Sequence, residues 1–149
     1  MVICQKVLNF YMKNNMAKIA VIGNTGWQNR RKVQQTLNDL KRKFTNELII
    51  IGAGGNEGAN SMVRKYALEF GIEYKEYNPS FSGYNLYSAM PESYYGKQYH
   101  FSQLHHRMKL IAQQCDYMMI MTNDETMDPV LKTAFTNSKK LNKPVVVLG

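Results

Sequence analysis

The sequence predicts a doubly wound α/β domain, Rossmann-like or flavodoxin-like, with helices on both faces of a five-stranded parallel sheet. Five short, mostly apolar segments of strand type alternate with four amphipathic segments of helical period. Most strand segments are apolar at nearly every position, which is typical of parallel strands buried on both faces. Because crossovers between parallel strands are right-handed, this alternation favours the strand order 3-2-1-4-5.

Each element follows from a local pattern. The predicted elements are, in order, strand 18–23, helix 30–44, strand 47–52, helix 59–70, strand 72–77, helix 99–114, strand 117–121, helix 129–141 and strand 144–148. The run KIAVIG is an apolar strand that ends at Gly23. In the first helix, one stripe carries Val33, Leu37, Leu40 and Phe44.

The later elements have equally local signals. Gly71 closes the second helix as its C-cap glycine. The third strand alternates in character, and the third helix carries Leu104 and Met108 on its apolar side. The fourth strand is a continuous apolar run. The last helix begins with Asp128 as N-cap and Pro129 at the first position, where proline is tolerated.

Composition indicates one globular domain, and its positive charge favours an anionic partner, with general solubility as the alternative. The 149 residues are 44% hydrophobic and 20% charged, and the net charge is +8. No apolar run reaches transmembrane length, and Cys4 and Cys115 have no metal-ligand spacing. We therefore expect a cytoplasmic protein without membrane contact, metal or cofactor. Residues 1–16 are expected to be an N-terminal extension, either an upstream start or a short surface helix, and residues 17–149 the binding domain.

A glycine loop after the second strand is the most informative feature of the sequence. The apolar run 49–51 ends in Gly52-Ala53-Gly54-Gly55-Asn56-Glu57-Gly58-Ala59-Asn60, and a helical pattern follows at once. A strand that turns through glycines onto a helix N-terminus presents backbone N–H groups and the positive end of the helix dipole. The segment predicts either a phosphate-binding loop or a tight turn without a ligand.

Ligands of open parallel sheets lie beyond the carboxyl ends of the strands. The loops 24–29, 53–60 and 122–128 follow the first, second and fourth strands. Trp27 is expected either to stack on a base or to cap the sheet edge. The candidate ligand-binding residues in these loops are Asn24, Thr25, Trp27, Gly54, Gly55, Asn56, Gly58, Ala59, Asn60, Thr122, Asn123 and Thr126.

A tyrosine-rich loop separates the third strand from the third helix. Residues 78–100 contain five tyrosines and Phe81 but few aliphatic side chains. A loop of this length is either an aromatic lid over the ligand, a self-packed loop or a contact between copies of the chain. We also expect the protein to form a homo-oligomer.

The loop Gly54-Gly55-Asn56-Glu57-Gly58-Ala59-Asn60 and the helix motif Leu104-His105-His106-Arg107-Met108 resemble the SLOG superfamily over residues 17–149. This Rossmann-like group includes the lonely-guy enzymes, the DNA-processing protein A family and small stand-alone nucleotide-binding domains. In the stand-alone members the glycine loop ends in Asp, where this chain has Asn60. The resemblance implies that Arg107 contacts the phosphate of a nucleotide; the alternative is a solvated arginine on the surface of the helix.

The loop after the fourth strand departs from the lonely-guy pattern. Those enzymes carry Pro-Gly-Gly-x-Gly-Thr followed by acidic residues, whereas this chain reads Thr122-Asn123-Asp124-Glu125-Thr126-Met127 without glycine. A loop without glycine does not let backbone approach a phosphate in the same way. Glu125 and Asp128 are carboxylates near the family's catalytic position, and neither falls on it.

The leading functional hypothesis is binding of a nucleotide or nucleotide-derived signal, of ADP-ribose or cyclic nucleotide type, by a sensor or sequestering protein. The alternative is a lonely-guy-like hydrolase that cleaves the N-glycosidic bond of nucleoside monophosphates, with Arg107 and Glu125 as candidate catalytic residues. A third hypothesis is single-stranded DNA binding, which the charge of +8 and the aromatic residues favour.

Overall fold

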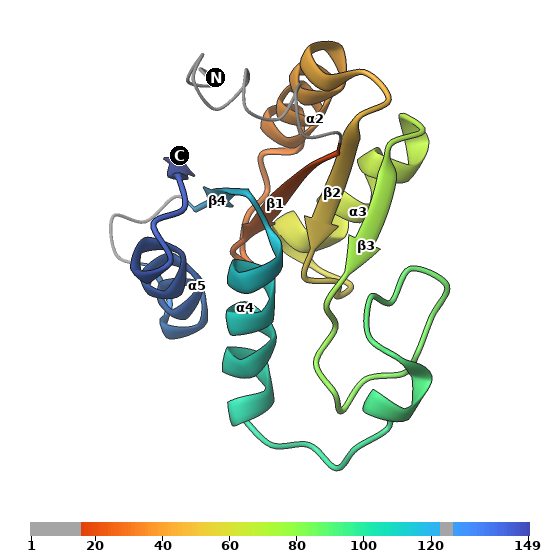
Figure 1. Cartoon of the computed structure of the whole chain (residues 1–149), viewed down its shortest axis with the longest axis vertical. Helices are drawn as coiled ribbons and strands as arrows, with labels where there is room; N and C mark the ends of the chain where they lie inside the picture. Colours follow the sequence, from red (N-terminus) through yellow and green to blue (C-terminus); the bar gives the residue numbers. More distant parts are fainter. Residues whose placement is uncertain (1–15, 123–126) are drawn as a thin grey trace.

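The computed structural model describes residues 16–122 and 127–149, and it confirms the predicted architecture (Figure 1). Five parallel strands form one sheet in the order β3-β2-β1-β4-β5. The elements are β1 (Ala17–Gly23), α2 (Arg30–Phe44), β2 (Leu48–Gly52), α3 (Gly58–Glu69), β3 (Glu73–Glu76), the 3₁₀ turn η1 (Glu92–Tyr94), α4 (Ser102–Gln114), β4 (Tyr117–Met121), α5 (Pro129–Lys140) and β5 (Val145–Leu148).

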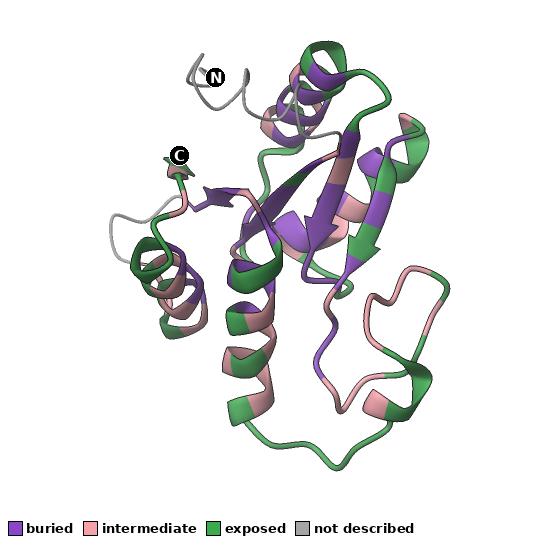
Figure 2. Cartoon of the chain, viewed as in Figure 1, coloured by how far each residue is buried: buried purple, intermediate pink, exposed green. Residues whose placement is uncertain are grey.

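Helices cover both faces of the sheet, as the sequence predicts. The helices α2 and α3 pack on one face, and α4 and α5 pack on the other. Alternate residues of β1 divide between two apolar clusters: Ile19 and Val21 pack with α2 and α3, while Ala20 and Ile22 pack with α4 and α5. The central strands are therefore buried on both sides, which accounts for their unbroken apolar runs (Figure 2).

The strand register brings the candidate loops to one edge of the sheet. Gly23 at the end of β1 lies beside Met121 of β4, and Gly52 at the end of β2 lies beside Glu76 of β3. Because all strands are parallel, the chain leaves each of these ends on the same side of the domain. The glycine loop and the segment after β1 consequently meet there.

The tyrosine-rich loop (78–100) folds back on itself at this same edge. The amide of Lys97 donates to the carbonyl of Ser80 over 2.9 Å, and the amide of Gly96 donates to that of Ser82 over 3.1 Å. The side chain of Gln103 joins the loop to α4 through a 2.7 Å hydrogen bond to Ser80 Oγ. This bond ties the beginning of the loop to the first turn of α4, the helix into which the loop leads (Figure 1).

Element boundaries agree with the sequence within one or two residues, except at the start of α4. That helix begins at Ser102 rather than at residue 99, because the amide of His100 donates to Gln103 Oε1 in a turn before the first helical residue. Within the described ranges, no helix is long and apolar enough to cross a membrane.

Candidate ligand-binding site

Two adjoining cavities lie at the carboxyl edge of the sheet, and we call them together the cleft. We call the larger one, of about 460 Å³, the glycine-loop half; its walls include Gly54, Gly55, Asn56, Glu57, Asn78, Pro79, Phe81 and Ser82. We call the other one, of about 300 Å³, the apolar half; its walls include Gly23, Phe101, Met108, Asp128, Pro129, Val130 and Leu131. Both halves share the lining residues Thr25, Asn60, Leu104 and Arg107, so they adjoin each other.

The glycines of the loop allow backbone to pass where side chains would collide. Gly58 has φ +67, and a Cβ there would lie 2.3 Å from the carbonyl oxygen of Thr25. This lets α3 begin directly against the segment that follows β1. Gly54 has φ +73, and a Cβ there would lie 2.5 Å from Asn78 Nδ2. Both positions therefore require glycine on steric and conformational grounds.

The amide of Ala59 is not part of the candidate anion site, because it already has a hydrogen-bond acceptor. Ala59 is fully buried, and its amide donates to the carbonyl of Asn24 over 3.1 Å, so it is not available to a ligand. In the described part of the chain, the amides of Gly54, Gly55 and Asn56 donate to no acceptor, and these residues line the cleft. No side chain caps the start of α3. The available N–H groups precede the helix.

Asn60 fastens the end of β1 to α3. Its Oδ1 accepts the amide of Gly23, and its Nδ2 donates to the carbonyl of Gly23, each over 3.1 Å. The residue is buried although its edge reaches the cleft. An aspartate would provide the acceptor but not the donor. The side-chain amide of Asn60 is therefore a structural bridge, because its oxygen and its nitrogen each bond to the backbone of Gly23.

Arg107 lies at the junction of the two halves of the cleft. Its Nη1 donates to the carbonyl of Ala53 over 2.8 Å, while its Nε is buried without a partner. In residues 16–122 and 127–149, no carboxylate lies within 4.0 Å of the guanidinium. Burial lowers the pKa of Arg107 to about 10, opposed by the charges of Asp128 and Glu76. At neutral pH the cleft thus contains a largely buried cation that forms no ion pair with any described residue.

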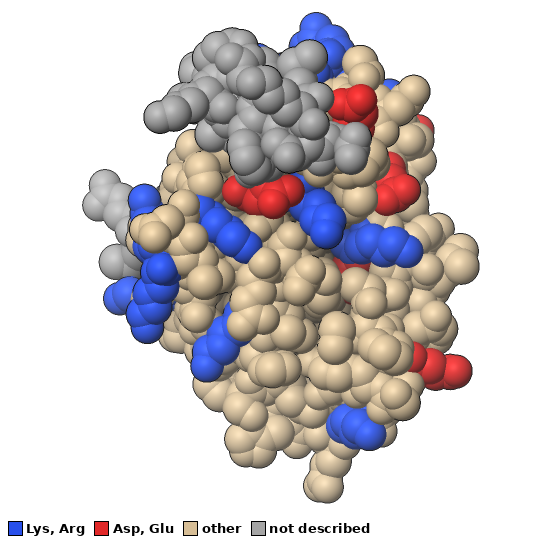
Figure 3. Space-filling view, in the orientation of Figure 1, with Lys and Arg blue, Asp and Glu red and all other residues tan. Residues whose placement is uncertain are grey.

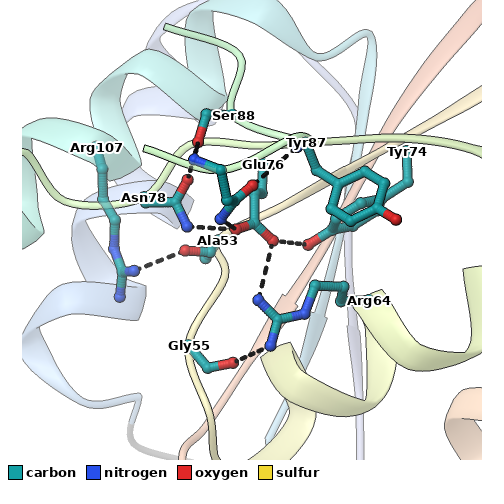
Figure 4. Close-up of polar contacts among 10 residues, drawn as sticks. Ala53, Gly55, Arg64, Tyr74, Glu76, Asn78, Tyr87, Ser88 and Arg107 are labelled. Atoms are coloured by element: carbon teal, nitrogen blue, oxygen red, sulfur yellow. Dashed lines mark hydrogen bonds and ion pairs between the residues drawn. The ribbon is translucent and has the colours of Figure 1, made fainter. Parts of the chain in front are cut away.

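A buried carboxylate lies beside the glycine loop, where several side chains form hydrogen bonds to it (Figure 4). Glu76, at the end of β3, is fully buried and accepts hydrogen bonds from Tyr74 Oη at 2.8 Å, from Asn85 Nδ2 at 2.8 Å and from Asn78 Nδ2. Burial, followed by the charge of Glu76, raises the pKa of Tyr74, so the phenol remains a proton donor. These donors offset the cost of burying the carboxylate.

Arg64 joins this cluster to the glycine loop. Its Nη1 lies 3.5 Å from Glu76 Oε1, and its Nη2 donates to the carbonyl of Gly55 over 3.2 Å. Since Asn78 and Asn85 belong to the tyrosine-rich loop, Glu76 connects both loops that line or border the cleft. Sequence reasoning missed this cluster. The available signal was the alternation of Ile72, Tyr74 and Glu76, which places the glutamate on the buried face of β3.

Trp27 does not line the cleft, which corrects the stacking hypothesis. It is 1% exposed, belongs to the apolar core beneath α2 and α3, and donates through Nε1 to the carbonyl of Asn29 over 3.0 Å. Asn24 is also occupied, because its side chain accepts the amide of Gly26 over 2.8 Å. Of the three candidates after β1, Thr25 reaches the cleft.

The loop after β4 contributes less than expected to the described site. Thr122 is buried, its amide donates to the carbonyl of Leu148 over 3.0 Å, and it lines neither half of the cleft. Asn123, Glu125 and Thr126 lie outside the described residues. Asp128 does line the apolar half. Among the described residues of this loop, Asp128 is therefore the one that reaches the cleft.

The tyrosine-rich loop contributes its first residues rather than its tyrosines. Phe81 lines the glycine-loop half, together with the polar groups of Asn78 and Ser82. None of the five tyrosines lines the cleft, and Tyr84 and Tyr99 are exposed to solvent. The side of the domain in Figure 3 carries lysine and arginine side chains across its middle, whereas the part over the tyrosine-rich loop has few charges.

The histidines and cysteine of the described chain form no second reactive centre. His105 is hydrogen-bonded through Nδ1 to Thr133 Oγ1 at 2.7 Å. Burial raises the pKa of Cys115 to about 11, so its thiol is protonated at neutral pH. Among the described residues, no group of three His, Cys, Asp or Glu side chains could hold a metal ion.

Comparison with known proteins identifies the fold. No protein-family model and no curated protein matches the sequence. The structure is similar to the molybdenum cofactor carrier protein MCP from Chlamydomonas reinhardtii, with a TM-score of 0.59 and 19% identity over 90% of this chain and 77% of that protein. A universal stress protein from Archaeoglobus fulgidus aligns with a TM-score of 0.44 and 14% identity, over 95% of this chain and all of that one. Its complex with dAMP gives a TM-score of 0.45 at 14% identity, over 89% and 98% of the two chains. At these identities, the first likeness supports the Rossmann-like fold and leaves the ligand open.

Proposed function

We propose that this protein binds a nucleotide or a nucleotide-derived small molecule in the cleft at the carboxyl edge of its sheet. The observation that carries the proposal is Arg107, whose guanidinium is largely desolvated, has an unpartnered Nε and forms no ion pair with a described residue. Such a cation is costly unless an anion pairs with it. A phosphate group meets this requirement with charge-assisted hydrogen bonds.

The glycine-loop half supplies complementary groups for the same phosphate. Gly54, Gly55 and Asn56 line it and leave their amide N–H groups without described acceptors. The start of α3 follows and adds the positive end of a helix dipole. The volumes of about 460 and 300 Å³ suit a molecule of nucleotide size.

Two further considerations support a small-molecule ligand. In open parallel sheets the cleft beyond the carboxyl ends of the strands is the usual binding position. The residues concerned, the glycine loop and Arg107, are also the ones in which the sequence resembles the SLOG superfamily. By its name, the similar MCP carries a cofactor, so this fold serves as a small-molecule carrier in at least one protein.

Binding without turnover accounts for the site better than hydrolysis. The segment after β4 lacks the glycines with which lonely-guy enzymes hold phosphate, and Asp128 caps α5 by accepting the amide of Leu131 over 2.9 Å. We therefore propose a sensor or sequestering role rather than a phosphoribohydrolase. Single-stranded DNA remains a third candidate, which strong salt dependence of binding would favour.

The test compares nucleotide with nucleoside. AMP, ADP-ribose and adenosine are titrated into the wild-type protein and into Arg107→Ala by calorimetry. Loss of one charge-assisted contact of about 1.5–3 kcal/mol should weaken AMP binding by roughly tenfold or more. Lys109→Ala is the matched control, because it removes an exposed cation from the same helix. It should leave the affinity within about twofold at moderate salt, where exposed charges are screened.

Two results of these titrations would contradict the proposed function. If adenosine bound as tightly as AMP, the phosphate would not be the recognised group. If Arg107→Ala and Lys109→Ala changed AMP binding equally, the effect of Arg107 would be one of net charge. Either outcome would remove the basis of the proposed function.

A further inference from the structure

Two side chains of opposite charge line the apolar half of the cleft without forming an ion pair with each other. Arg107 and Asp128 both line it, yet they lie farther apart than the 4.0 Å limit for an ion pair. The charge of Asp128 nevertheless acts on Arg107 and favours its charged form. Two opposite charges that line a cavity of about 300 Å³ without contact can bind different ends of one ligand, an anionic end and a hydrogen-bond donor.

One carboxylate oxygen of Asp128 is available to a ligand. Its Oδ1 accepts the amide of Leu131 over 2.9 Å at the start of α5, and this bond fixes the orientation of the side chain. Its other oxygen accepts no hydrogen bond from the described chain. An ionised carboxylate is an acceptor only, so it favours a ligand that donates hydrogen bonds.

The remaining walls suit a flat, weakly polar ring. Most of the other side chains that line this half are apolar, namely Phe101, Leu104, Met108, Pro129, Val130 and Leu131. They come from Phe101 and the first half of α4 and from the beginning of α5, two helices that pack against each other. Apolar and aromatic side chains bind the faces of a heterocycle, while a few polar groups at its edge decide its orientation.

We infer that the apolar half binds the base of the nucleotide and that Asp128 selects bases with an exocyclic amino group. The inference rests on the proposed function, because it takes the phosphate to lie with Arg107 and the glycine loop. An amino group donates to the free oxygen of Asp128. A carbonyl at the same position of the ring places one acceptor against another and leaves the carboxylate unsatisfied.

The pair AMP and IMP tests the inference, since both have the same phosphate and ribose and differ at the N1–C6 edge of the purine, where IMP has a carbonyl in place of the amino group and a proton on N1. We expect the wild-type protein to bind AMP about tenfold more tightly than IMP, as one satisfied hydrogen bond to a charged group implies. Asp128→Asn should reduce this preference to less than about threefold. Asparagine remains a good N-cap, so α5 should keep its start, and thermal unfolding checks this.

Arg107→Ala separates the two halves of the cleft. It should weaken AMP and IMP by similar factors, because both carry the phosphate. Equal binding of AMP and IMP to the wild type, or an unchanged preference in folded Asp128→Asn, would overturn the inference and leave the proposed function standing. If neither nucleotide bound to the wild type, the proposed function would fail and this inference with it.

Discussion

Glu76 is the residue whose replacement tests the described architecture of the site most severely. Its carboxylate has no exposed surface and accepts hydrogen bonds from Tyr74, Asn78 and Asn85, with Arg64 3.5 Å away. Glu76→Gln preserves the volume of the side chain but replaces one acceptor oxygen with an NH₂ group. That group faces donors, so at least one buried donor loses its partner.

The expected destabilisation of Glu76→Gln follows from the hydrogen bonds that the variant would lose. Hydrogen bonds to charged groups contribute about 1.5–3 kcal/mol each, and an unsatisfied buried donor costs about 1–3 kcal/mol. Removal of the buried charge recovers part of its desolvation free energy, so we expect a net loss of about 2–4 kcal/mol. For a domain of this size, 3 kcal/mol lowers the melting temperature by roughly 6–12 °C.

The assay is urea unfolding of the wild type, Glu76→Gln and Glu73→Gln. Glu73 lies on the same strand with an exposed side chain, so its replacement should stay within about 0.5 kcal/mol of the wild type. Because Arg64 joins Glu76 to the carbonyl of Gly55, Glu76→Gln should also weaken AMP binding. Equal stability of the two variants would refute the interpretation of Glu76 as the anchor of both loops.

Four further results are expected. Gly58→Ala should destabilise the protein by about 2–4 kcal/mol in urea unfolding, because φ is +67 and the new Cβ would lie 2.3 Å from a carbonyl oxygen; Gly83→Ala, with open space around it, should change little. In a Cys4→Ser background, the buried Cys115 should not react with a thiol reagent at pH 8 until the protein unfolds. The pKa of Cys115 in the folded state is raised from 9.0 to about 11. The thiol should therefore favour folding below pH 9 and lose that contribution to stability as the pH rises to 11. Cys115→Ala should make the free energy of unfolding less dependent on pH between 9 and 11. Incubation with AMP or CMP should release no free base, and steady release would instead favour the hydrolase hypothesis.

The sheet was predictable because its signals are local. Each apolar run of strand length is followed by a segment with an apolar stripe of helical period, and right-handed crossovers leave few possible strand orders. Ile19 to Ile22 show why this succeeds: adjacent residues enter opposite cores, so a strand buried on both faces must be apolar throughout.

The position of the cleft was predictable, but the atoms that line it were not. The glycine loop and Arg107 do meet at the carboxyl edge, yet the amide of Ala59 is used by Asn24, and Trp27 is part of the core. Hydrogen bonds between loops distant in sequence decide such details, and a pattern within one segment does not contain them. Glu76 illustrates the same limit, because its partners come from β3, α3 and the tyrosine-rich loop.

The most direct test of phosphate recognition in this cleft is NMR of the ¹⁵N-labelled protein during titration with AMP. We predict that the largest shifts occur at the amides of Gly54, Gly55 and Asn56 and at the Nε–H of Arg107, whose buried group has no partner in the described chain. The Nε–H signal should move little with adenosine, which lacks the phosphate. Shifts centred elsewhere, with these four signals unchanged at saturation, would contradict the proposed site.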